Sequence, residues 1–216
     1  LSTGDTLIFI RAYNLRPGIW KFRLTGEYIV EGNYYAWIPQ RELIDDETKF
    51  LNPVEYTTIT LPSTSNNAIS VGYYNQNNNS IVSESSNGYT RYGNIKPDIV
   101  AGGSNALVTI PGGATSVMSG SSVAGAVVAG CCALILQWAV TDGNYPGIYS
   151  SQIKTYIISG AKTRPGDIYP NRQWGYGMFD LQGVFDWIKQ TYTPRINTDF
   201  EEYRVKNLFI RKPRDL

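Results

Sequence analysis

The sequence has no histidine at any of its 216 positions. Imidazole is the usual general base of serine and cysteine hydrolases and a common ligand of catalytic zinc. These residues alone therefore form neither a Ser-His-Asp triad, nor a Cys-His pair, nor a histidine-ligated metal site. Chemistry of that kind requires a base from a second polypeptide.

Cysteine and net charge are also scarce. The only two cysteines are the neighbours Cys131 and Cys132, which could join only in a strained ring. We therefore expect no disulfide framework and two small buried side chains. Nineteen basic and eighteen acidic residues leave a formal net charge of +1, which argues against nucleic acid and anionic membranes as partners.

A signal peptide is missing from the first residues, which begin at Leu1 and resemble a strand. We therefore expect a cut end there. The longest apolar run, Val123 to Val140, is interrupted by Gly125, Gly130 and Gln137. Its length is close to the ~18 residues of a candidate membrane span, but its small residues favour a buried core helix.

Residues 1 to 55 are rich in aromatic residues that alternate with polar ones. Turn signals such as Arg16-Pro17-Gly18 and Glu31-Gly32-Asn33 separate the alternating stretches, as in the antiparallel strands of a sandwich or jelly roll. So few strands cannot bury two sheet faces, so we expect this module to begin upstream of Leu1.

After residue 55 short apolar stretches alternate with helical ones. Asn67 to Asn75 and Ile95 to Gly103 each predict a buried strand. Gly112 to Val140 predicts a small-residue loop followed by a long helix, and Ser150 to Lys162 predicts an amphipathic helix behind a serine cap. A further short helix follows Trp174, and the tail after Tyr192 alternates like an edge strand. This pattern predicts an α/β domain with parallel strands.

Ser122 lies where the glycine-containing loop enters the long helix, in Gly120-Ser121-Ser122-Val123-Ala124. In the first helical turn, unpaired backbone N–H groups and the positive end of the helix dipole stabilise a developing oxyanion. Such a serine is well placed to act as a nucleophile. The alternative is that Ser121 or Ser122 only caps the helix, because serine is a favoured N-cap residue.

Four segments form an ordered series: Ile95 to Ala101, Gly112-Gly113, Ser119 to Gly130 and Trp174 to Asp180. The series resembles the C-terminal half of subtilisin-like serine proteases, in which a KPD-type strand precedes the nucleophile motif G-T-S-M-A-x-P-x-V-A-G. The positions that match this motif are Gly120, Ser122, Ala124, Val128, Ala129 and Gly130. The resemblance implies that Ser122 is the nucleophile of an acyl-enzyme mechanism and that its own N–H contributes to the oxyanion hole.

In that family the triad aspartate, the triad histidine and the oxyanion asparagine all precede this region, and all three are absent here. The family positions matching Asp98 and Asp180 are structural, so we assign turn or strand-end stabilisation to both. Ser121 stands where threonine is usual. Ala101-Gly102-Gly103 replaces Ala-Pro-Gly, which we expect to loosen a turn on the substrate side.

The resemblance also implies the architecture: the C-terminal part of a three-layer subtilisin-like α/β domain with a parallel sheet. Ser122 would begin a buried central helix, and half of the sheet would come from elsewhere. We therefore expect the chain alone to be inactive and to expose a large apolar surface, or to have it covered by a companion chain.

Further segments resemble the Csp-type subtilases of clostridial spores: NYYAWIP, TTITLPS, a nucleophile motif without proline at Ala126, GCCALILQW and KNLFIRKP. In that group a jelly-roll module is inserted into the protease domain, and active members process the precursor of a cortex-lytic enzyme at germination. Residues 1–55 would be the last strands of the insert, and residues 56–216 the C-terminal portion of the protease domain. The implied location is the spore or the extracellular space.

The implied partners are a protein or peptide substrate, the N-terminal half of the same protease and, as a further candidate, its prodomain. No cofactor or metal is expected, because Asp45-Asp46-Glu47 is better explained as a solvated loop than as a cation site.

Two alternatives to an active protease remain open. One is a Csp-type pseudoprotease that binds germination partners as a scaffold. The other is a β-rich module that binds sugar or peptide through a row of aromatic rings, namely Trp20, Tyr34, Tyr35 and Trp37. These rings are, however, better explained as packing inside a sandwich.

Overall fold

The computed structural model describes residues 6–39 and 43–192. The chain divides into two compact units, Leu1–Leu51 and Asn52–Leu216. The division lies close to the predicted boundary after residue 55. The predicted edge strand in the C-terminal tail lies outside the described residues.

In the first unit, residues 6–39 and 43–51 form neither a strand nor an α-helix. An extended segment becomes a strand only when a neighbour pairs with its backbone, and the described part of this unit supplies no such ladder. Tyr35 and Trp37 stack at 5.6 Å, and they are 47% and 59% exposed. Their exposure does not single out a binding row, because apolar residues such as Ile8 and Phe9 are exposed as well. The jelly-roll insert stays a prediction.

The second unit is built on a three-stranded sheet in the order β2-β1-β3. The central strand β1 (Val71–Asn75) runs parallel to β3 (Ile99–Gly102), and the short β2 (Ser80–Ile81) pairs with it in antiparallel orientation. Val100 is fully buried, as expected for a strand covered on both faces. The two predicted strands are therefore confirmed, and the parallel pair forms the base of the α/β fold.

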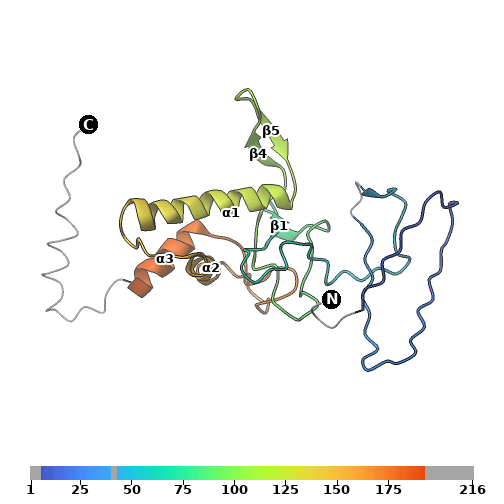
Figure 1. The fold of residues 1–216 in the computed structure, drawn as a ribbon. Coiled ribbons are helices and arrows are strands. Elements are labelled where there is room, and N and C mark those ends of the chain that lie inside the picture. Colours follow the sequence, from blue (N-terminus) through green and yellow to red (C-terminus); the bar gives the residue numbers. More distant parts are fainter. Residues whose placement is uncertain (1–5, 40–42, 193–216) are drawn as a thin grey trace, which may run out of the picture. The chain divides into compact units, whose positions relative to one another are not determined.

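Three helices pack beside this sheet (Figure 1). The long helix α1 (Ser121–Leu136) continues into a π-helical turn, η2 (Gln137–Thr141), while α2 (Ser150–Ser159) and α3 (Leu181–Tyr192) contact each other. The serine cap expected for α2 is wrong. Its N-cap is Tyr149, whose backbone N–H donates to the Gln152 side chain at 3.1 Å, so Ser150 is already helical.

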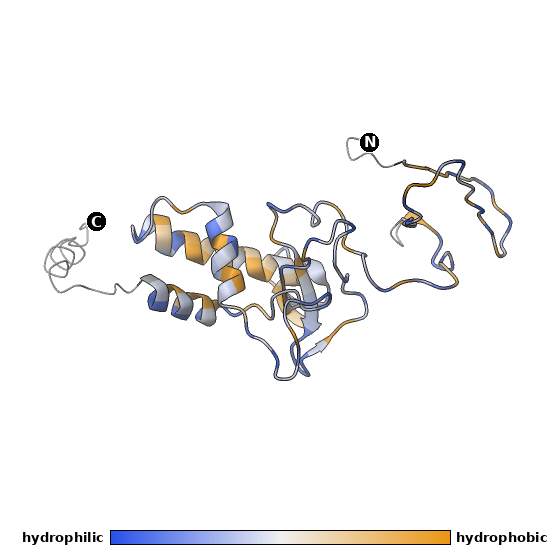
Figure 2. Ribbon diagram, turned by 90° about the horizontal axis from the view of Figure 1, so that it is seen from below, coloured by the Kyte–Doolittle hydropathy of each residue, from blue (hydrophilic) through white to orange (hydrophobic). Residues whose placement is uncertain are grey.

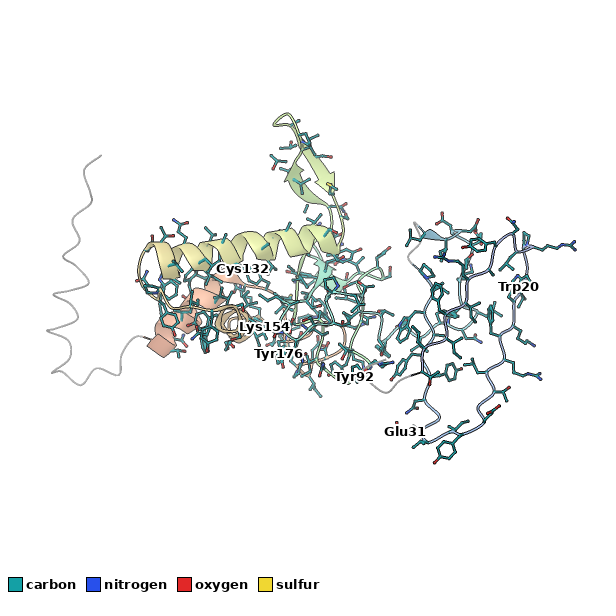
Figure 3. The ribbon with its side chains drawn as sticks, viewed as in Figure 1. Trp20, Glu31, Tyr92, Cys132, Lys154 and Tyr176 are labelled. Atoms are coloured by element: carbon teal, nitrogen blue, oxygen red, sulfur yellow. The ribbon has the colours of Figure 1, made fainter. Side chains whose placement is uncertain are left out.

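The face of α1 toward the core carries Ala124, Val128, Ile135 and, one turn further, Ala139. This spacing places the four side chains along one stripe of the helix. Figure 3 shows Cys132 on α1, and this residue also packs against the core. Both cysteines are free and only half-buried, so the expectation of two buried thiols is corrected; burial raises the pKa of both.

The opposite face of α1 is exposed and apolar. Figure 2 shows the hydrophobic residues, in orange, along the length of this helix. By length and composition, Ser121–Thr141 could cross a membrane, but its inner stripe packs against the core. The predicted buried helix is therefore buried on one face only in this chain, and the predicted exposed apolar surface is present on the other face. The larger exposed side chains of this face are Val127, Leu134, Leu136 and Val140, and the small ones are Ala126, Ala129, Gly130 and Ala133.

A β-hairpin not predicted from the sequence precedes α1, so the small-residue loop expected from Gly112 onward is wrong where the second strand of the hairpin lies. Strands β4 (Ala106–Thr109) and β5 (Thr115–Met118) are antiparallel, and the hairpin projects from the N-terminal end of α1 (Figure 1). Leu107 and Val117 face each other across it and are 73% and 60% exposed. The signal was present, because Gly112-Gly113 separates two runs that alternate between apolar and small or polar residues.

Candidate active site

Ser122 is exposed and is the second residue of α1. The helix follows Gly120, whose φ of +142° favours glycine and whose carbonyl accepts from the N–H groups of Val123 (3.1 Å) and Ala124 (3.2 Å). No side chain caps the helix. The capping alternative is therefore wrong, since Ser121 and Ser122 both lie inside the helix.

The first two N–H groups of α1, those of Ser121 and Ser122, have no acceptor among the described residues. They lie at the positive end of a sixteen-residue helix. An oxygen that gains negative charge beside Ser122 would be stabilised by these donors and by the helix dipole. The backbone at this point is thus suited to the charge that develops in acyl transfer.

Gly103 brings the end of β3 against the start of α1. Its carbonyl accepts from the Gly120 N–H at 2.8 Å, and its own N–H donates to Tyr74 O at 3.2 Å. A Cβ at Gly103 would lie 2.7 Å from Gly120 O and 3.2 Å from Ala124 Cβ, so only glycine fits this crossing. The bend that we expected to be loose is therefore tied on both sides.

A small cavity of about 70 Å³ lies beside Ser121, at the edge of β1. Its lining includes the hydroxyl-bearing residues Ser63, Ser70 and Ser86. Ser70 is 3% exposed, and its backbone N–H donates to the Asp98 carboxylate at 2.7 Å. The cavity is thus polar, and it lies against the β1 edge at Val71 and Gly72, with which β2 does not pair.

Asp98 lies at the opposite end of β3 from Gly103 and is 2% exposed. Its carboxylate contacts the ammonium groups of Lys96 and Lys154, each at 2.8 Å, and accepts from the Ser70 N–H at 2.7 Å. Lys154 comes from α2 (Figure 3). Burial lowers the pKa of Lys96, and the contact with Asp98 offsets this only in part. These contacts fasten the strands to α2 and leave Asp98 no catalytic role.

Asp180 lies just before α3 and likewise serves the fold. One carboxylate oxygen accepts from the Gln182 N–H at 3.2 Å, and the other contacts Lys162 at 2.8 Å. Burial acts to raise the pKa of Asp180, but the hydrogen bonds from Lys162 and from backbone N–H groups outweigh it and place the pKa below its ordinary value.

Within residues 6–39 and 43–192, no carboxylate or ammonium group hydrogen-bonds to the Ser122 hydroxyl. The same residues contain no group of three metal-ligating side chains close enough to hold an ion. Asp45 accepts from the backbone N–H of Glu47 at 2.9 Å, and Glu47 lies 4.0 Å from Lys49 with both side chains exposed. Among the described residues, Ser122 thus has donors for an oxyanion but no base.

Residues 45–177, more than half of the chain, match the model of the subtilase family, Peptidase_S8. The chain belongs to the subtilase family. Its matched region includes β1, β3, the hairpin and α1 with Ser122. The family predicted from the ordered motifs is therefore confirmed, and so is the subtilisin-like α/β fold class.

Among solved structures, this subtilase is similar to the Clostridium perfringens CspB protease, at 39% identity and a TM-score of 0.64 over 67% of this chain and 32% of that one. This likeness confirms the Csp-type resemblance. The patellamide maturation protease PatA (24% identity, TM-score 0.53, 63% of this chain and 48% of that one) and the prenylagaramide maturation protease PagA (22%, 0.51, 61% and 46%) share the fold. No curated protein matches the chain. The subtilase spans about a third of the CspB chain and less than half of the other two.

Proposed function

We propose that this subtilase chain carries the nucleophile of a serine endopeptidase and that Ser122 is that nucleophile. The observation that supports this most is the position of Ser122, exposed in the first turn of α1 beside two backbone N–H groups that have no acceptor within the described residues. The match of residues 45–177 to the subtilase family supports it independently.

The chemistry follows from this position. A base on another polypeptide takes the proton of the Ser122 hydroxyl while its Oγ bonds to the scissile carbonyl carbon. The electron pair of the carbonyl moves to its oxygen, which accepts from the Ser122 N–H. When the intermediate collapses, the C–N bond breaks and the amine leaves with the proton from the base. Water then hydrolyses the acyl-enzyme by the same steps.

A fluorophosphonate probe tests this proposal on the full-length protease, in which the base would be present. We expect stoichiometric labelling that Ser122→Ala abolishes and that the neighbouring control Ser121→Ala retains. Labelling that persists in Ser122→Ala would remove this serine from its role. A folded full-length protein that takes no label would favour the pseudoprotease scaffold.

We also propose a role in spore germination, with the precursor of a cortex-lytic enzyme as the protein substrate and the spore as the location. The likeness to the CspB protease supports this role. The expected result is limited cleavage of such a precursor by the full-length protease and none by its Ser122→Ala form. Intact precursor after incubation with a protease that takes the fluorophosphonate label would contradict the substrate assignment.

The partner that completes the site is proposed to be the N-terminal half of the protease, docked on the outer face of α1 and on the β1 edge. The outer face of α1 supports this, because small residues there allow a second element to approach closely and the valine and leucine side chains beside them supply apolar area. The first 55 residues would then be the last strands of the jelly-roll insert.

Two neighbouring valines on α1 form a matched test of this docking face. Val127 is 45% exposed and Val128 is 3% exposed. In the chain alone, we expect Val128→Ala to lower the free energy of unfolding by about 1–3 kcal/mol and Val127→Ala to change it by less than about 0.5 kcal/mol. In the assembled protease both should destabilise. Denaturant titration measures the change, and a Val127 effect that is equally small in both forms would contradict docking on this face.

A further inference from the structure

Two consecutive glycines end β3 and begin the bend that follows it: Gly102 is the last residue of the strand, and Gly103 is the first residue after it. The family pattern has proline followed by glycine at these two positions. Glycine has the greatest backbone freedom of all residues, so the bend cannot be held by its own sequence. Yet Gly103 receives the hydrogen bond from Gly120 that places the start of α1. A side chain that adds to the backbone hydrogen bonds of Gly103 would therefore help to fix the bend.

The side chain of Gln76 supplies that support. Gln76 directly follows β1, and its amide pairs with both backbone groups of Ser104. The Ser104 N–H donates to Gln76 Oε1 at 3.2 Å, and Gln76 Nε2 donates to Ser104 O. A Cβ at Gly102 would lie 3.2 Å from Gln76 Cβ and 3.3 Å from its Oε1. The glutamine side chain thus occupies the space over Gly102.

Both neighbours of Ser104 are bonded to the residues that lead into α1. Gly103 O accepts from the Gly120 N–H at 2.8 Å, and the Asn105 N–H donates to Ser119 Oγ at 2.8 Å. Movement of Ser104 would therefore shift the two residues that set where the first turn begins.

We propose that Gln76 is a positioning residue for Ser122, acting through Ser104 and the Gly103–Gly120 hydrogen bond. This inference rests on the proposed function for the role of Ser122. Gln76 contacts neither the serine nor any reacting atom, so its effect is on the location of the nucleophile and of its two free N–H groups.

Gln76→Ala in the full-length protease tests the proposal. We expect the rate of Ser122 labelling by a fluorophosphonate to fall about tenfold to a hundredfold, the range for a displacement near 1 Å at a reacting group. Hydrogen exchange at the Gly120 amide should become faster. Asn77→Ala, at the next residue, is the matched control and should leave both rates unchanged.

Gly102→Pro in the Gln76→Ala background is the rescue variant. The Gly102 N–H has no acceptor among the described residues, and Ala101 already lies in a strand, so proline removes no hydrogen bond here. Its Cβ would lie 3.2 Å from the Cβ that alanine keeps at position 76, a contact that a shift of a few tenths of an ångström relieves. We expect this double variant to regain most of the labelling rate.

The proposal would be overturned if a folded Gln76→Ala protein kept the wild-type labelling rate and the wild-type rate of hydrogen exchange at Gly120. It would also be overturned if Gly102→Pro restored the thermal stability of Gln76→Ala but not its labelling rate. If Gln76→Ala does not fold, Gln76→Glu, which keeps the acceptor for the Ser104 N–H, should label at an intermediate rate, and a wild-type rate would overturn the proposal. Failure of the proposed function would give a different result: the Ser122→Ala protein would still be labelled by the fluorophosphonate.

Discussion

The isolated chain is expected to hydrolyse peptides about 10⁶-fold more slowly than the assembled protease, the scale of loss when subtilisin lacks its serine or histidine. The reason is chemical. The chain has no histidine, and no titratable side chain in its described part hydrogen-bonds to Ser122, so the hydroxyl cannot be deprotonated as it attacks. The backbone donors of α1 remain, but they stabilise only charge that has already developed.

The measurement is turnover of fluorogenic peptides by the chain alone and after addition of the N-terminal half. Addition should restore activity with the wild-type chain and fail with Ser122→Ala. Turnover by the isolated chain at a rate near that of the assembled protease would show that the base does not come from elsewhere.

The second large effect is expected at Asp98, where Asp98→Asn should lower the free energy of unfolding by about 3–5 kcal/mol. Asp98 is the only carboxylate that contacts Lys96 and Lys154 in the described structure. The substitution keeps the volume but leaves two ammonium groups together, one of them 1% exposed, without a counter-ion. Typical domains are stable by only about 5–15 kcal/mol, so the loss is a large fraction of the total.

Denaturant titration of the chain measures this loss, with Lys162→Met as the control. Lys162 also contacts a carboxylate, that of Asp180, but its side chain is 69% exposed, so the unfolding midpoint should hardly move. A loss at Asp98→Asn as small as that of the control would show that the buried cluster does not fasten β3 to α2.

The pH dependence of this loss follows from Lys96, whose pKa in the folded chain lies below its ordinary value of 10.5 because of burial. Between the folded and unfolded pKa values, the unfolded chain binds more protons, so stability rises with pH in that interval. Asp98→Asn removes the contact that opposes this lowering. The deficit of the variant should therefore shrink as the pH rises toward 10.5. A deficit independent of pH would contradict charge as its cause.

The amino-acid sequence by itself determined the family, the α/β class and the position of Ser122. These rest on local order: a buried strand, a glycine-containing loop and a long apolar helix follow each other, and each can be read from neighbouring residues. The sequence also excluded a histidine of this chain as the base for Ser122. The exposed apolar surface was likewise predictable, because a helix apolar on all sides needs cover on more than one face.

Only the tertiary structure decided which groups meet. Lys154 joins Asp98 and Gln76 joins Ser104 across long stretches of chain, and no local pattern encodes such contacts. It also showed that Gly103 fits tightly between β3 and α1 and that one face of α1 alone is buried. The first unit shows the same dependence on long-range contacts. Alternation of apolar and polar residues marks a segment that is able to form a strand, but the strand exists only where a second backbone pairs with it.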